Sequence, residues 1–231
     1  MGIDLSIIIP TYNEEKRILK TLQAYTSFFD KKLRCEYIVA DQSHDSTRKI
    51  VKEFMKAHKN VHLLELPGRG KGGAVTEAFK VAKGSLIGFT DADSAVSPEG
   101  YYRMLKGLEG YDAVIGSRGL SRSDVVQYNQ SLFRRFGSFV LGLFFVRVMF
   151  GLKIRDTQCG AKIFRREKIL RIIPKMRIRN AIFDVELLWR FGKTGKINEV
   201  PVRWVDSAYS NFRWYEIIPE LYWLLRVRFG V

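Results

Sequence analysis

Two aspartates one residue apart, Asp91 and Asp93, are the side chains of this sequence best suited to chemistry. They follow the apolar run Leu86–Thr90, which is typical of a buried strand. If that strand belongs to a parallel sheet, both carboxylates emerge at its carboxyl end, where open α/β sheets bind ligands. Two such oxygen donors can hold Mg²⁺ or Mn²⁺, which take further ligands from water and from the phosphates of a substrate. The pair alone is weak evidence, because a strand end before a helix start at Ser97–Glu99 has the same pattern.

Three more polar turns follow expected strands of the first half. They are Pro10-Thr11-Tyr12-Asn13-Glu14, Asp41-Gln42-Ser43-His44-Asp45-Ser46-Thr47 and Gly68-Arg69-Gly70-Lys71-Gly72-Gly73. Polar loops at one edge of a parallel sheet converge on a single crevice. We expect the glycine-rich turn to present backbone N–H groups and a helix N-terminus to phosphate, with Lys71 and Arg69 adding charge. Its spacing is not that of a Walker sequence, and a plain helix start remains the alternative.

Strands and helices are expected to alternate in the first half, which predicts an α/β fold with a mostly parallel sheet covered by helices on both faces. A single domain spans 1–231, because no linker, repeat or low-complexity segment interrupts it. The expected strands are 5–10, 37–40, 61–64, 86–90 and 113–115, and the expected helices are 14–29, 47–58, 73–83 and 101–108.

Positive charge is concentrated in the second half. The 231 residues carry a net charge of +15, of which +2 falls in 1–115 and +13 in 116–231. This asymmetry favours a polyanionic partner: nucleic acid, an anionic membrane surface or a phosphorylated substrate.

The cysteines and the apolar segments bear on location. Cys35 and Cys159 match neither a disulfide framework nor a metal site, which is typical of reduced thiols in the cytoplasm. The N-terminus has no signal-peptide pattern. The longest apolar run, 136–146, is shorter than the roughly 18 residues of a membrane-spanning helix. The segments 139–150 and 215–229 mix aromatic residues with arginines, which suits helices that lie at a membrane interface, although core packing would explain them too.

Taken together, these motifs resemble those of the family 2 glycosyltransferases with the GT-A fold. The matching motifs are Pro10–Glu14, the aspartate turn 40–47 and Asp91-Ala92-Asp93. Within that family the chain is similar to the dolichyl-phosphate sugar synthases, and more narrowly to the dolichyl-phosphate glucosyltransferases. The passages that carry this closer resemblance are 70–74, 116–118, 155–160, 183–188 and 200–202.

The resemblance implies a division of labour along the chain, with 1–115 binding the nucleotide sugar and 116–231 facing the acceptor and the membrane. It implies a metal-dependent, inverting transfer of a hexose to a polyprenyl or dolichyl phosphate, with Mg²⁺ or Mn²⁺ on Asp91 and Asp93. It places the enzyme on the cytoplasmic face of the membrane and implies that nucleic acid is not a partner. Whether the enzyme acts with a membrane-embedded partner protein stays an open question. The implied nucleotide site comprises Pro10, Tyr12, Glu14, Asp41, Lys71 and Asp91, the acceptor-phosphate site Arg118, Arg134 and Ser138, and the catalytic set Asp91, Asp93, Arg118 and Asp156.

Some positions depart from the family pattern. Ala40 and Gln42 replace an aspartate and a glycine of the aspartate turn, so recognition of the base is expected to differ. Asp206 is followed by Ser207 and the mannosyl members' lysine-containing tail is missing, which favours UDP-glucose over GDP-mannose as the donor.

The chemistry of transfer agrees with these residue types. A metal and a Lys or Arg can stabilise the charge that develops on a departing diphosphate. A phosphate acceptor is already anionic and needs orientation more than a strong base, and Arg provides this through its bidentate fork. Asp156 and Asp184 are further candidates for the acceptor site, although a turn would explain Asp156 as well and a helix start is the favoured explanation for Asp184.

Three alternatives stay open. A family 2 transferase acting on a glycan acceptor would share every motif. A nucleotidyltransferase would share the sheet and the metal, but the chain has no N-terminal glycine-rich loop of the kind such enzymes use. A non-catalytic protein that binds nucleic acid or anionic lipid would explain the basic half but not the clustered polar turns.

Overall fold

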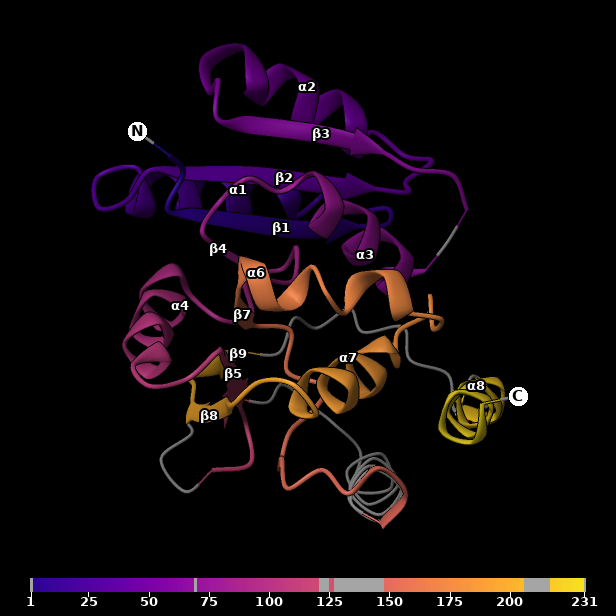
Figure 1. The fold of residues 1–231 in the computed structure, drawn as a ribbon. Coiled ribbons are helices and arrows are strands. Elements are labelled where there is room, and N and C mark those ends of the chain that lie inside the picture. Colours follow the sequence, from indigo (N-terminus) through magenta and orange to yellow (C-terminus); the bar gives the residue numbers. More distant parts are fainter. Residues whose placement is uncertain (1, 69, 121–124, 127–147, 206–216, 231) are drawn as a thin grey trace.

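The structure is a computed structural model that describes residues 2–68, 70–120, 125–126, 148–205 and 217–230. Its centre is a seven-stranded sheet in the order β3-β2-β1-β4-β7-β5-β8 (Figure 1). Strand β7 is antiparallel to both of its neighbours, and the other strand pairs are parallel. The strands are β1 (Leu5–Thr11), β2 (Cys35–Asp41), β3 (Val61–Glu65), β4 (Leu86–Phe89), β5 (Ala113–Ser117), β7 (Lys162–Arg165) and β8 (Ile197–Pro201).

Helices cover both faces of this sheet. Successive strand residues point to opposite sides, and apolar residues on each side pack against helices. In β1, Ile7 and Ile9 pack under one set of helices, whereas Ile8 packs under the other. The first set is α1 (Ile18–Phe29), α2 (Thr47–Ala57) and α4 (Pro98–Leu105). The second set is α3 (Lys71–Val81), α6 (Arg166–Ile169), α7 (Phe183–Gly192) and α8 (Ile217–Phe229). Two 3₁₀ turns, η1 (Lys106–Leu108) and η3 (Ile173–Lys175), and a small pair of strands, β6 (Val125–Val126) and β9 (Trp204–Val205), complete the described elements.

The expected fold class is confirmed. The differences in detail include strand β8, which was not expected, and α4, which begins at Pro98 rather than Tyr101. Two more differences bear on the site. Helix α1 begins at Ile18 rather than Glu14, because the backbone N–H groups of residues 13–15 donate to side chains of the loop after β2 and of the first residue of α2. Strand β7 was not expected, since Lys162 interrupts its apolar pattern. The lysine is nevertheless fully buried, because a carboxylate of α7 compensates its charge.

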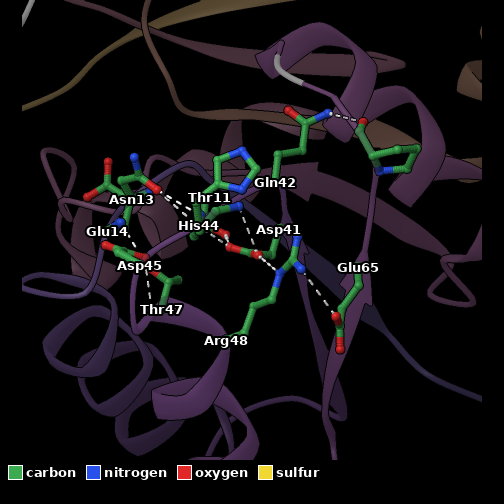
Figure 2. A network of polar contacts seen from close by, with 12 residues as sticks. Thr11, Asn13, Glu14, Asp41, Gln42, His44, Asp45, Thr47, Arg48 and Glu65 are labelled. Carbon is green, nitrogen blue, oxygen red and sulfur yellow. Dashed lines mark hydrogen bonds and ion pairs between the residues drawn. The ribbon is translucent and has the colours of Figure 1, made fainter.

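The loops after β1 and β2 are joined by a network of polar contacts around Asp41 (Figure 2). The Asp41 carboxylate is fully buried and accepts hydrogen bonds from the hydroxyls of Thr11 (2.7 Å) and Ser43 (2.6 Å). It also accepts one from Nε of Arg48 (2.7 Å), on the first turn of α2. Burial is the largest single influence and acts to raise the pKa of Asp41, but these hydrogen bonds together hold that pKa below its usual value.

A substitution of Asp41 by Asn should therefore destabilise the protein in a pH-dependent manner. Asp41→Asn removes the buried one of the two carboxylate partners of Arg48, the other being Glu65, and is expected to lower the free energy of unfolding at pH 7 by about 2–4 kcal/mol. A depressed folded pKa contributes stability above the unfolded pKa of about 3.9, and this contribution is lost as the pH falls through the folded value. Urea denaturation between pH 7 and pH 3 should show the two proteins converging in acid.

The matched control is Glu53→Gln on the exposed side of α2, whose side chain is 70% exposed. This change should leave the stability within about 0.5 kcal/mol at every pH. A difference between wild type and Asp41→Asn that stays constant with pH would show that the carboxylate charge is not what holds these loops.

Candidate active site at the carboxyl ends of the strands

A cleft of about 620 Å³ opens at the carboxyl ends of β1, β2 and β4. It brings together Pro10, Tyr12 and Glu14 from the loop after β1 with Lys71 at the start of α3 and the Asp91–Asp93 pair. Asp41 is not among the residues that line it and supports the adjoining loop from behind. The complete lining is Pro10, Thr11, Tyr12, Glu14, Gln42, Gly70, Lys71, Ala74, Asp91, Ala92, Asp93, Asn180 and Ala181.

Asp91 is held from two sides. Its Oδ1 accepts a hydrogen bond from Nζ of Lys71 at 2.5 Å. Its Oδ2 lies against the backbone of Gly160, where an added Cβ would stand only 1.9 Å away. A side chain at position 160 would therefore displace the carboxylate, which explains why a glycine follows Cys159. Asp93 is held by its own loop, since its Oδ1 accepts a hydrogen bond from the N–H of Ala95 at 3.0 Å.

The charges of the cleft act on one another. Burial is the largest influence on Asp91 and acts to raise its pKa, but Lys71, Lys162 and Arg118 together hold the pKa below the usual value. Asp91 is therefore ionised near neutral pH. The Glu14 pKa is raised, mainly by burial and further by the charges of Asp93 and Asp91, against the influence of Arg17. The cleft thus gathers negative charge.

A buried ion pair lies behind this cleft. The ammonium of Lys162 is 2.7 Å from Oδ1 of Asp184, and the two side chains are 0% and 2% exposed. Nζ of Lys162 also donates to the carbonyl oxygen of Cys159 at 2.6 Å. Asp184 was a candidate for the acceptor site, but its burial and its pairing with Lys162 give it a structural position. Lys162 was missed, although a lysine inside the apolar run 161–164 signals a buried partner.

Arg118 and Asp156 form a bidentate pair outside the residues that line the cleft. Nε and Nη2 of Arg118 donate to the Asp156 carboxylate at 2.7 and 2.9 Å. The guanidinium also lies over the Trp204 ring, 5.2 Å from its centroid. Asp156 therefore orients Arg118. The other two residues of the expected acceptor-phosphate site, Arg134 and Ser138, lie outside the described residues.

Two glycines of the glycine-rich turn pack against the segment before α7. The N–H groups of Gly72 and Gly73 donate to the carbonyl oxygens of Asn180 (3.2 Å) and Arg179 (2.9 Å). A Cβ at position 72 would lie 2.5 Å from Cβ of Phe183, so the glycine allows this close approach. Contrary to expectation, the N–H groups of these two glycines are thus already paired with carbonyl oxygens, and the residues of this turn that line the cleft are Gly70 and Lys71. Arg69 lies outside the described residues.

Gln42, which stands where the family pattern has a glycine, connects two loops. Its Oε1 accepts a hydrogen bond from the N–H of Gly70 at 2.8 Å, and its Nε2 donates to the carbonyl oxygen of Pro67 at 3.3 Å. The side chain also lines the cleft. This departure from the family pattern thus fixes the loop after β3 against the end of β2.

The segment before α7 completes the cleft with Asn180 and Ala181, which sequence reasoning missed. Glu186 is fully buried and holds this segment, since its carboxylate accepts hydrogen bonds from the N–H groups of Arg177 and Ile178. The Phe183–Leu188 motif indicated a helix start and an acceptor-site candidate, Asp184. It gave no sign that the preceding residues reach across to α3.

The described residues supply few ligands for a metal ion. No group of three or more His, Cys, Asp or Glu side chains is arranged among them to hold one. The cleft instead offers the two carboxylates of Asp91 and Asp93, which fits a divalent ion that takes its remaining ligands from a substrate and from water. As for the membrane, none of the described helices is long and apolar enough to span it.

Comparison with known proteins identifies the family. The family model described as glycosyl transferase family 2 matches residues 6–173. A dolichyl-phosphate β-glucosyltransferase of Dictyostelium discoideum is 35% identical over 89% of this chain and 67% of its own length. The Drosophila melanogaster enzyme of that name is 33% identical over all of this chain and 76% of its own, and the Saccharomyces cerevisiae enzyme is 32% identical over 89% and 69%.

Solved structures share the fold at lower sequence identity. Glucosyl-3-phosphoglycerate synthase from Mycobacterium tuberculosis, in complex with Mn²⁺, UDP and glucosyl-3-phosphoglycerate, has a TM-score of 0.68 and 18% identity, covering 100% of this chain and 81% of that one. TarS of S. aureus in complex with UDP-GlcNAc has a TM-score of 0.63 and 20% identity, covering 98% and 66%. These likenesses show the GT-A fold. With its family model, its relatives and its fold in agreement, the chain belongs to glycosyl transferase family 2 and is a glycosyltransferase.

Proposed function

We propose that this glycosyltransferase moves glucose from UDP-glucose to a dolichyl or related polyprenyl phosphate, with the help of Mg²⁺ or Mn²⁺. The single observation that carries the proposal is the cleft in which Asp91, Asp93 and Lys71 meet at the carboxyl ends of the strands. The relatives named above support the acceptor and the sugar, since each is called a dolichyl-phosphate β-glucosyltransferase.

The donor would lie along the cleft. Pro10, Tyr12 and Glu14 would contact the base and ribose, and Asp41 would hold their loop through Thr11 rather than touch the nucleotide. Bound to Asp91 and Asp93, the metal would neutralise charge on the diphosphate as it leaves. Lys71 would bind the same diphosphate through its ammonium group.

The acceptor would approach from the side of the second half. Arg118, oriented by Asp156, would bind its phosphate together with Arg134 and Ser138. The phosphate is an anionic nucleophile and needs no strong general base, so the protein would contribute mainly orientation and charge neutralisation. A single in-line displacement would invert the anomeric centre.

The aromatic face of α8 would place the enzyme at a membrane. Tyr222, Trp223 and Phe229 are 56%, 40% and 66% exposed. The guanidinium of Arg226 lies 5.7 and 5.5 Å from the first two rings. Exposed aromatic rings beside arginines suit the headgroup region of an anionic bilayer, where a polyprenyl acceptor is embedded.

The transfer reaction is tested with radiolabelled sugar. Purified protein, a polyprenyl phosphate and Mn²⁺ or Mg²⁺ should move label from UDP-glucose, but not from GDP-mannose, into an organic extract. Asp93→Ala should reduce this transfer by about 100-fold or more, because it removes a metal ligand. Glu109→Ala, at an exposed position outside the cleft, is the matched control and should transfer normally.

Three results would count against this proposal. Label from GDP-mannose alone would change the donor, and label entering only a glycan would change the acceptor. Full activity of Asp93→Ala, with its fold confirmed by circular dichroism, would contradict the metal site.

Membrane contact is tested by flotation with phosphatidylcholine vesicles that contain phosphatidylserine. Replacement of both Trp223 and Phe229 by Ala should weaken binding by about tenfold, since two exposed rings no longer enter the interface. Transfer to a short, water-soluble prenyl phosphate should be unchanged. Tyr111→Ala, which removes a 39% exposed aromatic ring outside α8, is the control and should bind as wild type does. Equal flotation of the α8 variant would rule out this face.

A further inference from the structure

Lys71 is the only positively charged side chain among the described residues that line the cleft. Three carboxylates line it as well, those of Glu14, Asp91 and Asp93. Without a bound cation the cleft is thus net negative and would repel a diphosphate. The ammonium of Lys71 lies where a cation is needed, on Oδ1 of Asp91.

The carboxylate that Lys71 holds is also one that a metal ion would bind. Oδ2 of Asp91 lies against the backbone of Gly160, where an added Cβ would stand 1.9 Å away, and Oδ1 is held by Lys71. A metal ion that enters from the cleft therefore competes with the Lys71 ammonium for the negative charge of Asp91.

Lys71 differs from the other lysine near Asp91 in its freedom to move. The Lys162 side chain is 0% exposed and is fixed between Asp184 and the carbonyl oxygen of Cys159. Lys71 is 27% exposed, and its flexible four-carbon stem starts at the first residue of α3. Its described ion pair is with Asp91 alone.

We propose that Lys71 holds the cation position of the cleft in the absence of metal and releases Asp91 when metal and nucleotide bind together. This inference rests on the donor and metal sites of the proposed function. The ammonium then turns from Asp91 to the diphosphate. Asp91 is paired with the metal ion instead, so neither Asp91 nor Lys71 is left without a partner of opposite charge.

A coupling between metal and nucleotide follows from this exchange. A metal ion that arrives alone must displace Lys71 from its carboxylate, which weakens its binding. A nucleoside diphosphate gives the displaced ammonium a new partner, which removes that cost. Because coupling between two sites is reciprocal, the metal must strengthen nucleotide binding by the same factor. Lys71 is thus a positioning residue for the metal as well as a ligand of the donor.

The test measures Mn²⁺ binding by electron paramagnetic resonance, with and without saturating UDP, and it requires no turnover. Without UDP, Lys71→Met should bind Mn²⁺ roughly fivefold tighter than wild type, because the competing ammonium is gone. UDP should tighten Mn²⁺ binding in wild type by a larger factor than in Lys71→Met. Lys71→Gln, with a polar end, should behave like Lys71→Met and serves if the apolar variant does not fold.

Lys80→Met is the matched control, since it removes the same charge from the exposed end of the same helix. It should leave both Mn²⁺ affinities unchanged. If Lys80→Met tightened Mn²⁺ binding as much as Lys71→Met does, the inference would be overturned. The change in net charge alone would then explain the effect.

Two further outcomes separate this inference from the proposed function. If wild type binds Mn²⁺ and UDP, but Lys71→Met shows the same Mn²⁺ affinity and the same effect of UDP, the exchange is contradicted and the metal site stands. If wild type binds no Mn²⁺ even with UDP, the metal site itself is contradicted and the inference falls with it.

Discussion

The structure of the cleft depends on keeping the carboxylate of Asp91 ionised at the end of a buried strand. Burial alone would favour its neutral form, and a neutral acid binds metal poorly. Lys71 compensates from the cleft side and Lys162 from within the protein, where Asp184 in turn balances its charge. Positive and negative charges therefore alternate in the order Lys71, Asp91, Lys162 and Asp184. Removal of one of them leaves a neighbour unpaired in a region of low dielectric.

This arrangement explains why the antiparallel strand β7 lies beside β4. The turn that leads into β7 places Gly160 against Asp91, and the first residue of β7 is Lys162. The segment before α7 then crosses the start of α3 and adds Asn180 and Ala181 to the cleft. The cleft is thus built from both halves of the sequence, although the polar turns that predicted it all lie in the first half.

Much of this could be predicted from the sequence because it depends on local patterns. The apolar runs and polar turns of the first half predicted that strands and helices alternate along the chain. They also predicted that the turns after the strands meet in one cleft, which Pro10, Tyr12, Glu14, Lys71 and Asp91 line. The parts that could not be predicted depend on contacts between distant residues. The N–H groups of Gly72 and Gly73 looked free to bind phosphate because nothing local shows that carbonyl groups of 179–180 reach them. Nothing local predicted that Lys162 is buried in a strand, because the carboxylate that pairs with it lies 22 positions further along the chain.

A crystal structure with UDP and Mn²⁺ tests the central claim most directly, namely that this cleft binds the donor diphosphate through a metal on Asp91 and Asp93. We predict Mn²⁺ bound to both carboxylates and to the diphosphate, with the uracil beside Tyr12. We also predict that Nζ of Lys71 moves from Asp91 to a phosphate oxygen. A diphosphate bound elsewhere, or a metal ion without contact to either aspartate, would contradict the account.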